Sequence, residues 1–321
     1  MAAAREPEEI YEETRKEGRR RLSRPVVELA ATALVGGFDV AFGVAAYALA
    51  ASAVGGSRGR LAGAIAFGIG FVFIVVGKSE LFTENFLIPI AGLNRRDRGS
   101  WFKLGELWAV ALVLNIVGGL LIVVVMTSHG VLRHGSAQPL LELADHVTDY
   151  STLAAFLSAL IAGALMTLMT WFVEGAATSL GVRIIMAWIV GSIIVLGGFN
   201  HAIVSTIELL YGMRLGSAVS YGSLFTNLGL SVAGNLAGGS LRSDRTGGNL
   251  ATLEVPREQG EVLDLIGRHA VLRQAGDGVT RAPEGDEQRC RSEKERRRRM
   301  KTAKQTHLYL PPIVFGRCGG P

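Results

Sequence analysis

Long apolar stretches alternate with short polar segments along most of this chain. The apolar stretches cover residues 26–54, 61–93, 104–127, 153–173, 182–211 and 218–241. A helix needs about 20 apolar residues to cross a hydrocarbon layer about 30 Å thick. The first five stretches meet that length plainly and the sixth is weaker. The pattern predicts an all-α membrane protein with six transmembrane helices.

The second and fifth stretches are each interrupted by polar residues. The interruptions are Lys78-Ser79-Glu80-Leu81-Phe82-Thr83-Glu84-Asn85 and Gly197-Gly198-Phe199-Asn200-His201. Backbone that leaves the helix at membrane depth is tolerated only where protein or a wet cavity satisfies its polar groups. Broken helices in corresponding positions of two halves mark a pathway near the membrane midplane. We therefore expect helices two and five to be broken and to meet at a pore.

A short motif also relates the two halves of the chain. The third and sixth stretches carry the same Asn-x-x-Gly-Gly pattern 120 positions apart, in Asn115, Gly118, Gly119, Asn235, Gly238 and Gly239. With three helices per half, the two halves would have opposite topology in the membrane. Small residues also recur in membrane helices simply to let neighbours pack, so coincidence stays open for this motif alone.

Composition indicates the class of protein, and the placement of charges indicates its orientation in the membrane. Of 321 residues, 49% are hydrophobic and only 19% charged, which excludes an ordinary soluble domain. Arginine and lysine precede the first stretch and follow the second and fourth, which places both termini in the cytoplasm. We expect a multi-pass protein of the inner (plasma) membrane with a cytoplasmic N-terminal helix at residues 1–24 and a transport domain at residues 25–241.

The two ends of the chain differ from the apolar middle. Residues 7–24 carry acids first and bases last, the order that suits a helix dipole, and predict a helix on the membrane surface with its basic end near anionic lipid. Residues 242–321 form a polar, basic tail that predicts disorder. Because Arg242 follows the apolar residues so soon, the sixth helix looks cut short. Basic runs of this kind are usually solvated, so no nucleic acid is expected, nor any metal or cofactor.

Five ionisable residues within or beside the apolar stretches need an explanation. For His201, a functional role in the broken fifth helix competes with a packed histidine bonded to a backbone carbonyl. Glu80 and Glu84 are either solvated or cap a half-helix, with a structural role favoured over a chemical one. Asp39 and Glu208 either pair with a neighbour or are protonated, and the sequence leaves this choice open.

Three motifs together resemble the formate/nitrite transporter family. They are Lys78-Ser79-Glu80-Leu81-Phe82-Thr83-Glu84-Asn85, Gly198-Phe199-Asn200-His201 and Gly234-Asn235-Leu236-Ala237-Gly238-Gly239, in this order within residues 22–241. The resemblance implies an aquaporin-like fold of inverted three-helix repeats. It also implies a homopentamer in which every protomer has its own pore. The substrates of the family are small monovalent anions such as formate, nitrite, acetate, lactate and hydrosulfide.

The resemblance also implies roles for individual residues. Thr83 would face the central His201 from the loop that interrupts helix two, with Phe82 in a hydrophobic constriction. The other pathway candidates are Phe67, Phe71, Phe199, Asn200 and Ser205. The helix-break loop would be formed by Lys78, Glu80, Leu81, Glu84 and Asn85.

The chain departs from the formate channels of the family at three places. Those channels have glutamate immediately before the histidine and asparagine four residues after it, where this chain has Asn200 and Ser205. They also have asparagine on the fourth helix, near Gly163 and Ala164 of this chain. These changes alter the hydrogen bonds available to the histidine. We therefore expect a member of the anion class and leave the anion open.

A histidine-centred pore is also consistent with simple solvation arguments. An anion would pay a large desolvation cost in an apolar constriction, whereas a neutral acid would not. A buried histidine can exchange a proton with the anion, so the expected partners are a small anion, a proton and the lipid bilayer. This is transport and not enzyme chemistry.

Two alternatives stay open at this point. One is an aquaporin-like pore for neutral solutes with a structural His201. The other is a membrane protein that does not transport because its sixth helix is damaged, or that anchors the basic tail.

Overall fold

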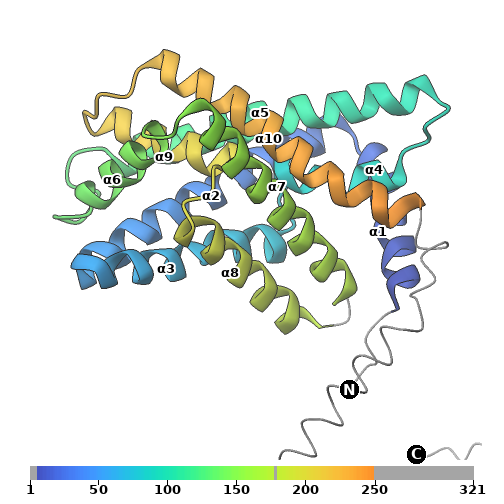
Figure 1. Ribbon diagram of the computed structural model, residues 1–321, viewed down its shortest axis with the longest axis horizontal. Helices are drawn as coiled ribbons and strands as arrows, with labels where there is room; N and C mark the ends of the chain where they lie inside the picture. The colour runs from blue at the N-terminus through green and yellow to red at the C-terminus, as the bar shows by residue number, and fades with distance from the viewer. Residues whose placement is uncertain (1–5, 177–178, 249–321) are drawn as a thin grey trace, which may run out of the picture. The chain divides into compact units, whose positions relative to one another are not determined.

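In this computed structural model, the described residues are 6–176 and 179–248, and their secondary structure is helical throughout. The elements are α1 (Pro7–Leu22), α2 (Val26–Val54), α3 (Gly56–Gly77), the short 3-10 helix η1 (Phe82–Phe86), α4 (Ile88–Gly92), α5 (Arg98–Met126), α6 (Ala137–Thr148), α7 (Thr152–Gly175), α8 (Leu180–Leu196), α9 (Ala202–Arg214) and α10 (Tyr221–Gly248) (Figure 1).

Helical structure is interrupted at both polar segments. After α3, Lys78 adopts a left-handed backbone with φ 54°, and the chain runs through η1 before α4 begins beside Pro89. After α8, Gly198 has φ 62°, a conformation that glycine adopts at no steric cost, and α9 begins after His201. Proline near the first position of α4 suits a helix start because the N–H that it lacks would have no helical partner.

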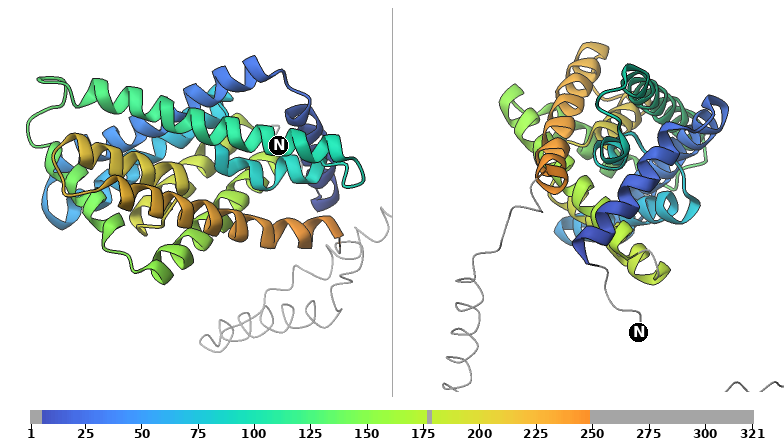
Figure 2. Two further views of the ribbon diagram at one scale, coloured as in Figure 1. Left: turned by 90° about the horizontal axis from the view of Figure 1, so that it is seen from above. Right: turned by 90° about the vertical axis from the view of Figure 1, so that its right-hand side faces the viewer.

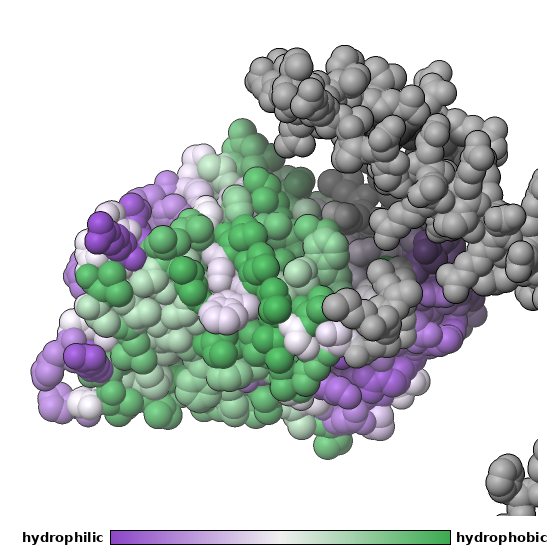
Figure 3. Space-filling model, turned by 90° about the horizontal axis from the view of Figure 1, so that it is seen from below, coloured by the Kyte–Doolittle hydropathy of each residue, from purple (hydrophilic) through white to green (hydrophobic). Residues whose placement is uncertain are grey.

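Several helices are suited to a lipid environment. Among the described residues, α2, α3, α5 and α7 are long and apolar enough to cross a membrane, and α8 is a shorter apolar helix. The space-filling view shows a broad hydrophobic band between hydrophilic ends (Figure 3). This confirms the prediction of an all-helical membrane protein.

The long helices pack extensively against one another. The helix α2 contacts α3 and α5, α7 contacts α10, and α3 contacts α8. Near one end α6 packs on α9, and near the other α1 packs on α4 (Figures 1 and 2). The helix α9 is buried over most of its length, whereas α3 and α8 each keep an exposed apolar face.

Two elements differ from the sequence-based expectation. The segment between the third and fourth stretches, expected as a loop, contains α6, whose buried face includes Leu140, Ala144 and Val147. The sixth helix was expected to be cut short at Leu241, but the helical backbone of α10 continues to Gly248. The rest of the predicted tail, residues 249–321, lies outside the described residues.

Candidate functional site

The two interruptions meet at a hydrogen bond between Thr83 and His201. The Oγ1 of Thr83, in η1, lies 2.8 Å from Nε2 of His201, immediately before α9. Both side chains are buried, with exposed fractions of 1% and 0%. The contact joins residues 118 positions apart in the chain.

A second hydrogen bond fixes the tautomer of this histidine. The backbone N–H of Val204 donates to Nδ1 of His201 over 3.2 Å, so that His201 is the N-cap of α9. A nitrogen that accepts a hydrogen bond carries no proton, so the proton of the neutral ring is on Nε2. Nε2–H therefore donates to Thr83. Adding a second proton at Nδ1 requires the Val204 bond to break.

Aromatic rings surround this pair on the α3 side. Phe67 and Phe71 are fully buried with ring centroids 5.6 Å apart, and Phe71 meets the His201 ring edge-on at 5.9 Å. Phe82 is buried and forms an edge-to-face contact with Phe86 at 5.1 Å. The polar pair thus lies among apolar rings, where a bare anion is poorly solvated.

Asn115 of α5 holds the first interruption in place. Its Nδ2 donates to the carbonyl oxygens of Ala33 at 2.7 Å and Glu80 at 2.9 Å, and its Oδ1 accepts from the N–H of Phe82 at 2.8 Å. One amide thereby satisfies backbone groups on α2 and on both sides of Leu81.

Asn235 of α10 holds the second interruption in the same way. Its Nδ2 donates to the carbonyl oxygens of Ala159 at 2.7 Å and Asn200 at 3.0 Å, and its Oδ1 accepts from the N–H of Ala202 at 2.8 Å. His201 therefore occupies the position in this loop that Leu81 occupies in the other.

The glycines of the repeated motif allow close helix contacts. A Cβ on Gly118 would collide with the carbonyl of Leu34, and one on Gly238 with the carbonyl of Leu160. Gly119 and Gly239 instead face side chains, those of Ile207 and of Phe86 respectively. These contacts give the motif a packing role in both helices.

Three other predicted pathway residues are close to His201 in the chain. The amide of Asn200 donates to the carbonyl of Ala155 and exchanges hydrogen bonds with Asn227 of α10 at 2.9 and 3.2 Å. Ser205 is buried in the first turn of α9, and Phe199 is half-buried. Asn200 therefore supports the loop, and its side chain is occupied by protein partners.

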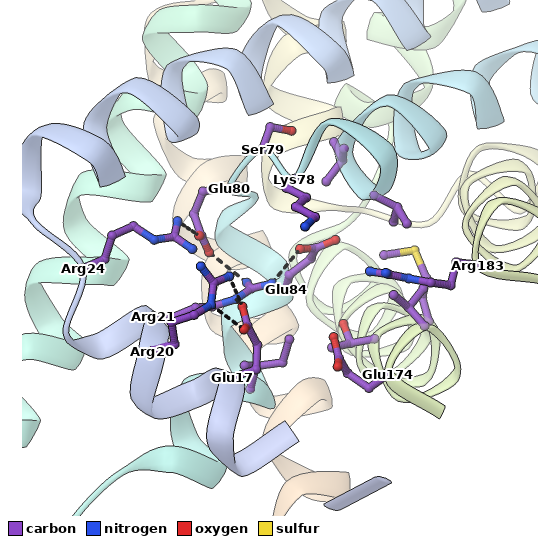
Figure 4. Close-up of a pocket in the computed structure, with 16 residues that line it drawn as sticks. Glu17, Arg20, Arg21, Arg24, Lys78, Ser79, Glu80, Glu84, Glu174 and Arg183 are labelled. Carbon is purple, nitrogen blue, oxygen red and sulfur yellow. Dashed lines mark hydrogen bonds and ion pairs between the residues drawn. The ribbon is translucent and has the colours of Figure 1, made fainter. Parts of the chain in front are cut away.

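A charged cluster covers the other loop at the α1 end (Figure 4). Arg21 lies 2.9 Å from Oε1 of Glu80 and 3.6 Å from Glu84, while Arg24 lies 2.7 Å from Oε2 of Glu80. Arg21 also donates to Oδ1 of Asn85 at 3.1 Å. The cluster borders a cavity of about 210 Å³, which Lys78 and Arg183 also line.

This cluster corrects the interpretation of two carboxylates. Glu80 and Glu84 were expected to be solvated or to cap a half-helix, but both are buried and ion-paired with α1. At the basic end of α1, which was expected near lipid, Arg21 and Arg24 face the protein, whereas Arg19 and Arg20 are exposed.

The charges on α1 shift the pKa of two of its groups. Burial lowers the pKa of the Arg21 guanidinium, but Glu80, Glu84 and Glu17 outweigh it, so the pKa lies above its usual value. For Glu17, burial raises the pKa, but the hydrogen bond from Arg20 and the charge of Arg21 reverse the balance and lower it. Both groups therefore stay charged near neutral pH.

Further polar contacts complete the two loops. Asp39 accepts a hydrogen bond from Ser79 at 2.6 Å, so it has a polar neighbour. Asn85 donates to the carbonyl of Leu81 at 3.3 Å, and the indole N–H of Trp108 donates to the carbonyl of Asn85 at 3.0 Å. Glu208 is buried on α9.

Sequence reasoning missed several residues of the site. Arg21 and Arg24 were noticed only as part of a basic segment, and Asn227 and Tyr150 carried no signal in the sequence. Asn227 bonds to Asn200, and the Tyr150 hydroxyl donates to the carbonyl of Gly198. Such contacts join distant segments, so no local pattern marks them.

Comparison with known proteins supports the same family. Inner membrane protein YfdC of Escherichia coli K12 is 24% identical over 72% of this chain and 74% of its own length. Formate channel FocA of the same strain is 27% identical over 48% of this chain and 54% of its own.

The fold is also similar to that of a solved structure, a pentameric formate channel with formate bound. The TM-score is 0.58 with 19% identity, over 68% of this chain and 94% of the other. Finally, residues 8–243 match the family described as formate/nitrite transporter, which is most of the chain. This chain is therefore a member of the formate/nitrite transporter family.

Proposed function

We propose that this protein is a pore for small monovalent anions, centred on His201 and Thr83, in a homopentamer with one pore per protomer. Each protomer has six membrane-spanning helices in two inverted three-helix repeats, with both termini in the cytoplasm. The observation that carries the proposal is the buried hydrogen bond between Thr83 Oγ1 and His201 Nε2, which joins the two helix breaks.

The matched asparagine contacts support the repeat architecture. Asn115 and Asn235 each bond to one carbonyl of a neighbouring helix and to two backbone groups of a helix break. Corresponding breaks in two halves are typical of transporters with inverted repeats. The backbone of α10 is helical over 28 residues, about 42 Å. Its apolar part ends at Leu241, and α10 is not among the described helices that are long and apolar enough to cross a membrane.

The chemistry of the central pair suits an anion. The neutral His201 ring presents Nε2–H, and the Thr83 hydroxyl that accepts it keeps its own proton for another acceptor. An oxyanion that enters between them can take hydrogen bonds from both groups, which replace part of its lost hydration. Phe71 and Phe82 narrow the surroundings and keep out larger hydrated ions.

Proton transfer to the anion is coupled to the cap of α9. A neutral imidazole that lost its Nε2 proton would become an imidazolate, so transfer starts from the imidazolium form. That form needs a proton on Nδ1, where Val204 N–H now donates. Losing this bond leaves a buried N–H unpaired, at about 1–3 kcal/mol, and charging the buried ring adds a further desolvation cost. Passage as a neutral acid therefore requires a small rearrangement at the start of α9.

The test is flux of labelled formate, nitrite, acetate and lactate into proteoliposomes between pH 5 and 8. Thr83→Val removes the hydroxyl while keeping the shape, and His201→Ala removes the imidazole. Thr206→Val is the matched control, because Thr206 is buried on α9 but bonds only to the Ala202 carbonyl within its helix. We expect pH-dependent anion flux in wild type and Thr206→Val, and its loss or flattening in the other two.

Other outcomes distinguish the alternatives. Flux that ignores both pH and loss of the imidazole would favour a neutral-solute pore with a structural histidine. An assembled wild-type pentamer that conducts none of the four anions would contradict the proposal.

A further inference from the structure

An exposed histidine is connected to the His201 loop through Tyr150. Tyr150 lies in the short connection between α6 and α7, and its hydroxyl donates to the carbonyl of Gly198, three residues before His201. Nε2 of His146, on α6, lies 3.1 Å from the same hydroxyl, and the two rings meet edge-on at 5.1 Å. Ser158 of α7 also donates to this hydroxyl at 3.4 Å and accepts from the N–H of Asn200 at 3.0 Å.

The direction of each hydrogen bond in this network follows from its chemistry. A carbonyl can only accept, so the single Tyr150 proton points to Gly198. His146 Nε2 must then carry a proton and donate to the phenol oxygen. This leaves Nδ1 of His146 as the site for a second proton, which can bind without breaking the contact to Tyr150. His146 differs in this respect from His201, whose Nδ1 accepts a bond from the protein.

His146 also has access to water. It is exposed and borders a cavity of about 520 Å³ at the α6 end, with Gly198 at its base. The titratable groups that share this cavity are Tyr47 of α2, Arg60 of α3 and Glu142 of α6. Asp145 and Asp149 flank His146 along the chain.

We propose that Tyr150 is a positioning residue for the pore. His146 makes the strength of the hydrogen bond from Tyr150 to the Gly198 carbonyl depend on the proton concentration at the α6 end. A protonated His146 is a charge-assisted donor to the phenol oxygen, and this polarises the Tyr150 hydroxyl toward Gly198. The loop before His201 is then held more firmly in acid. The inference rests on the proposed function for its effect on transport, but its effect on the loop does not.

The first measurement is amide hydrogen exchange of residues 197–204 in the full-length protein between pH 5 and 8. Tyr150→Phe removes only the hydroxyl, and His146→Gln keeps an N–H donor that cannot titrate. Tyr211→Phe is the matched control, because the Tyr211 hydroxyl also donates to a backbone carbonyl, that of Ala41 at 3.2 Å, away from this loop. Dividing each rate by that of the control removes the intrinsic pH dependence of exchange.

We expect Tyr150→Phe to speed exchange of the loop about 2- to 12-fold at pH 5, the range that one hydrogen bond is worth. His146→Gln should exchange like wild type at pH 8 and faster than wild type at pH 5. The double variant should add nothing to Tyr150→Phe, because both changes act through one contact. Loop exchange that is the same in Tyr150→Phe and the control, or additive effects of the two changes, would overturn the inference.

Anion flux provides the second measurement. If the wild type conducts anions, Tyr150→Phe should raise the KM for the anion more than it lowers the maximal rate. Tyr150→Phe and His146→Gln should both lose the same acid-side part of the pH profile of flux. If wild type conducts nothing, the proposed function fails while the exchange data still decide the role of Tyr150. Unchanged KM and pH profile in Tyr150→Phe, with flux present, would contradict the inference.

Discussion

At the scale of single residues, two asparagines organise both helix breaks. Each amide bonds two backbone groups of a helix break that would otherwise be unpaired in a membrane interior, where no water replaces the partner, and also bonds one carbonyl within a neighbouring helix. The amide side chain suits this task because it donates two hydrogen bonds and accepts others. Asn115 and Asn235 therefore determine where Thr83 and His201 can meet.

This role predicts a large cost for an apolar replacement of similar size. Asn115→Leu leaves the Phe82 N–H and the Glu80 carbonyl without this partner, at about 1–3 kcal/mol for each buried unpaired group. We expect the unfolding free energy to fall by about 2 kcal/mol or more, measured by thermal or denaturant unfolding in detergent. Asn94→Ala, in an exposed loop, is the control. Equal stability of the two variants would show that the hydrogen bonds of Asn115 do not stabilise the fold.

At the scale of helices, close backbone contacts depend on particular glycines. Gly118 of α5 lies against the Leu34 carbonyl of α2, and Gly238 of α10 lies against the Leu160 carbonyl of α7. Other glycines on the same helices, Gly105 and Gly229, have nothing within 4 Å of an added Cβ. The same residue type thus has different consequences at different positions.

Alanine scanning of these glycines gives a matched test. Gly118→Ala and Gly238→Ala force two helices apart, and overpacking of this kind typically costs about 1–3 kcal/mol. Gly105→Ala and Gly229→Ala should be neutral or slightly stabilising, because alanine favours the helix by about 1 kcal/mol over glycine. Thermal stability of the four purified variants checks this. If all four behave alike, close packing at these glycines is not important for stability.

The attachment of α1 is also a property of helices. It depends on Glu80, which pairs with both Arg21 and Arg24 while only 2% of its side chain is exposed. Glu80→Gln removes the carboxylate that both arginines share, but it leaves Arg21 with Glu17 and Glu84 and Arg24 with Glu28. The cost is therefore below the about 3–5 kcal/mol of a fully unpaired buried charge. Glu80→Gln should still weaken the attachment of α1 and speed tryptic cleavage within residues 7–22. Glu106→Gln, which breaks the more exposed pair with Lys103, should leave that cleavage unchanged. Resistance of Glu80→Gln to trypsin would show that other contacts hold α1.

At the scale of the whole molecule, apolar side chains cover much of the outer surface. Val113, Leu121 and Val125 of α5, with Leu157 and Ile161 of α7, are among the exposed large residues. Exposed apolar surface of this extent is satisfied by lipid, by neighbouring protomers or by both. The surface therefore fits a protein that both spans a membrane and assembles within it.

The proposed assembly has a direct test. Native mass spectrometry of the full chain in a mild detergent should give a mass of five protomers, and the His201→Ala variant should give the same mass because His201 is buried inside one protomer. A different stoichiometry for wild type would contradict the pentamer. A wild-type pentamer with a dissociated His201→Ala variant would show that flux data on that variant report assembly.

Much of the fold could be predicted from the sequence alone. Apolar stretches of membrane length fix an all-helical membrane protein, because backbone in lipid must satisfy its own hydrogen bonds. The polar segments around Thr83 and His201 marked the positions where the helices stop, and three motifs in order indicated the family. These features lie in the local order of residues along the chain, which the sequence displays directly.

The tertiary structure decided what surrounds those residues. The pairing of Glu80 with Arg21, the support of Asn200 by Asn227, and the link from Tyr150 to Gly198 all join segments far apart in the chain. The helix α6 and the full length of α10 are likewise visible only in the folded chain. The physical reason is that a polar side chain in an apolar interior must find a hydrogen-bond or ion-pair partner. The sequence determines which side chains need one. Only the packing of distant helices determines which partner each of them meets.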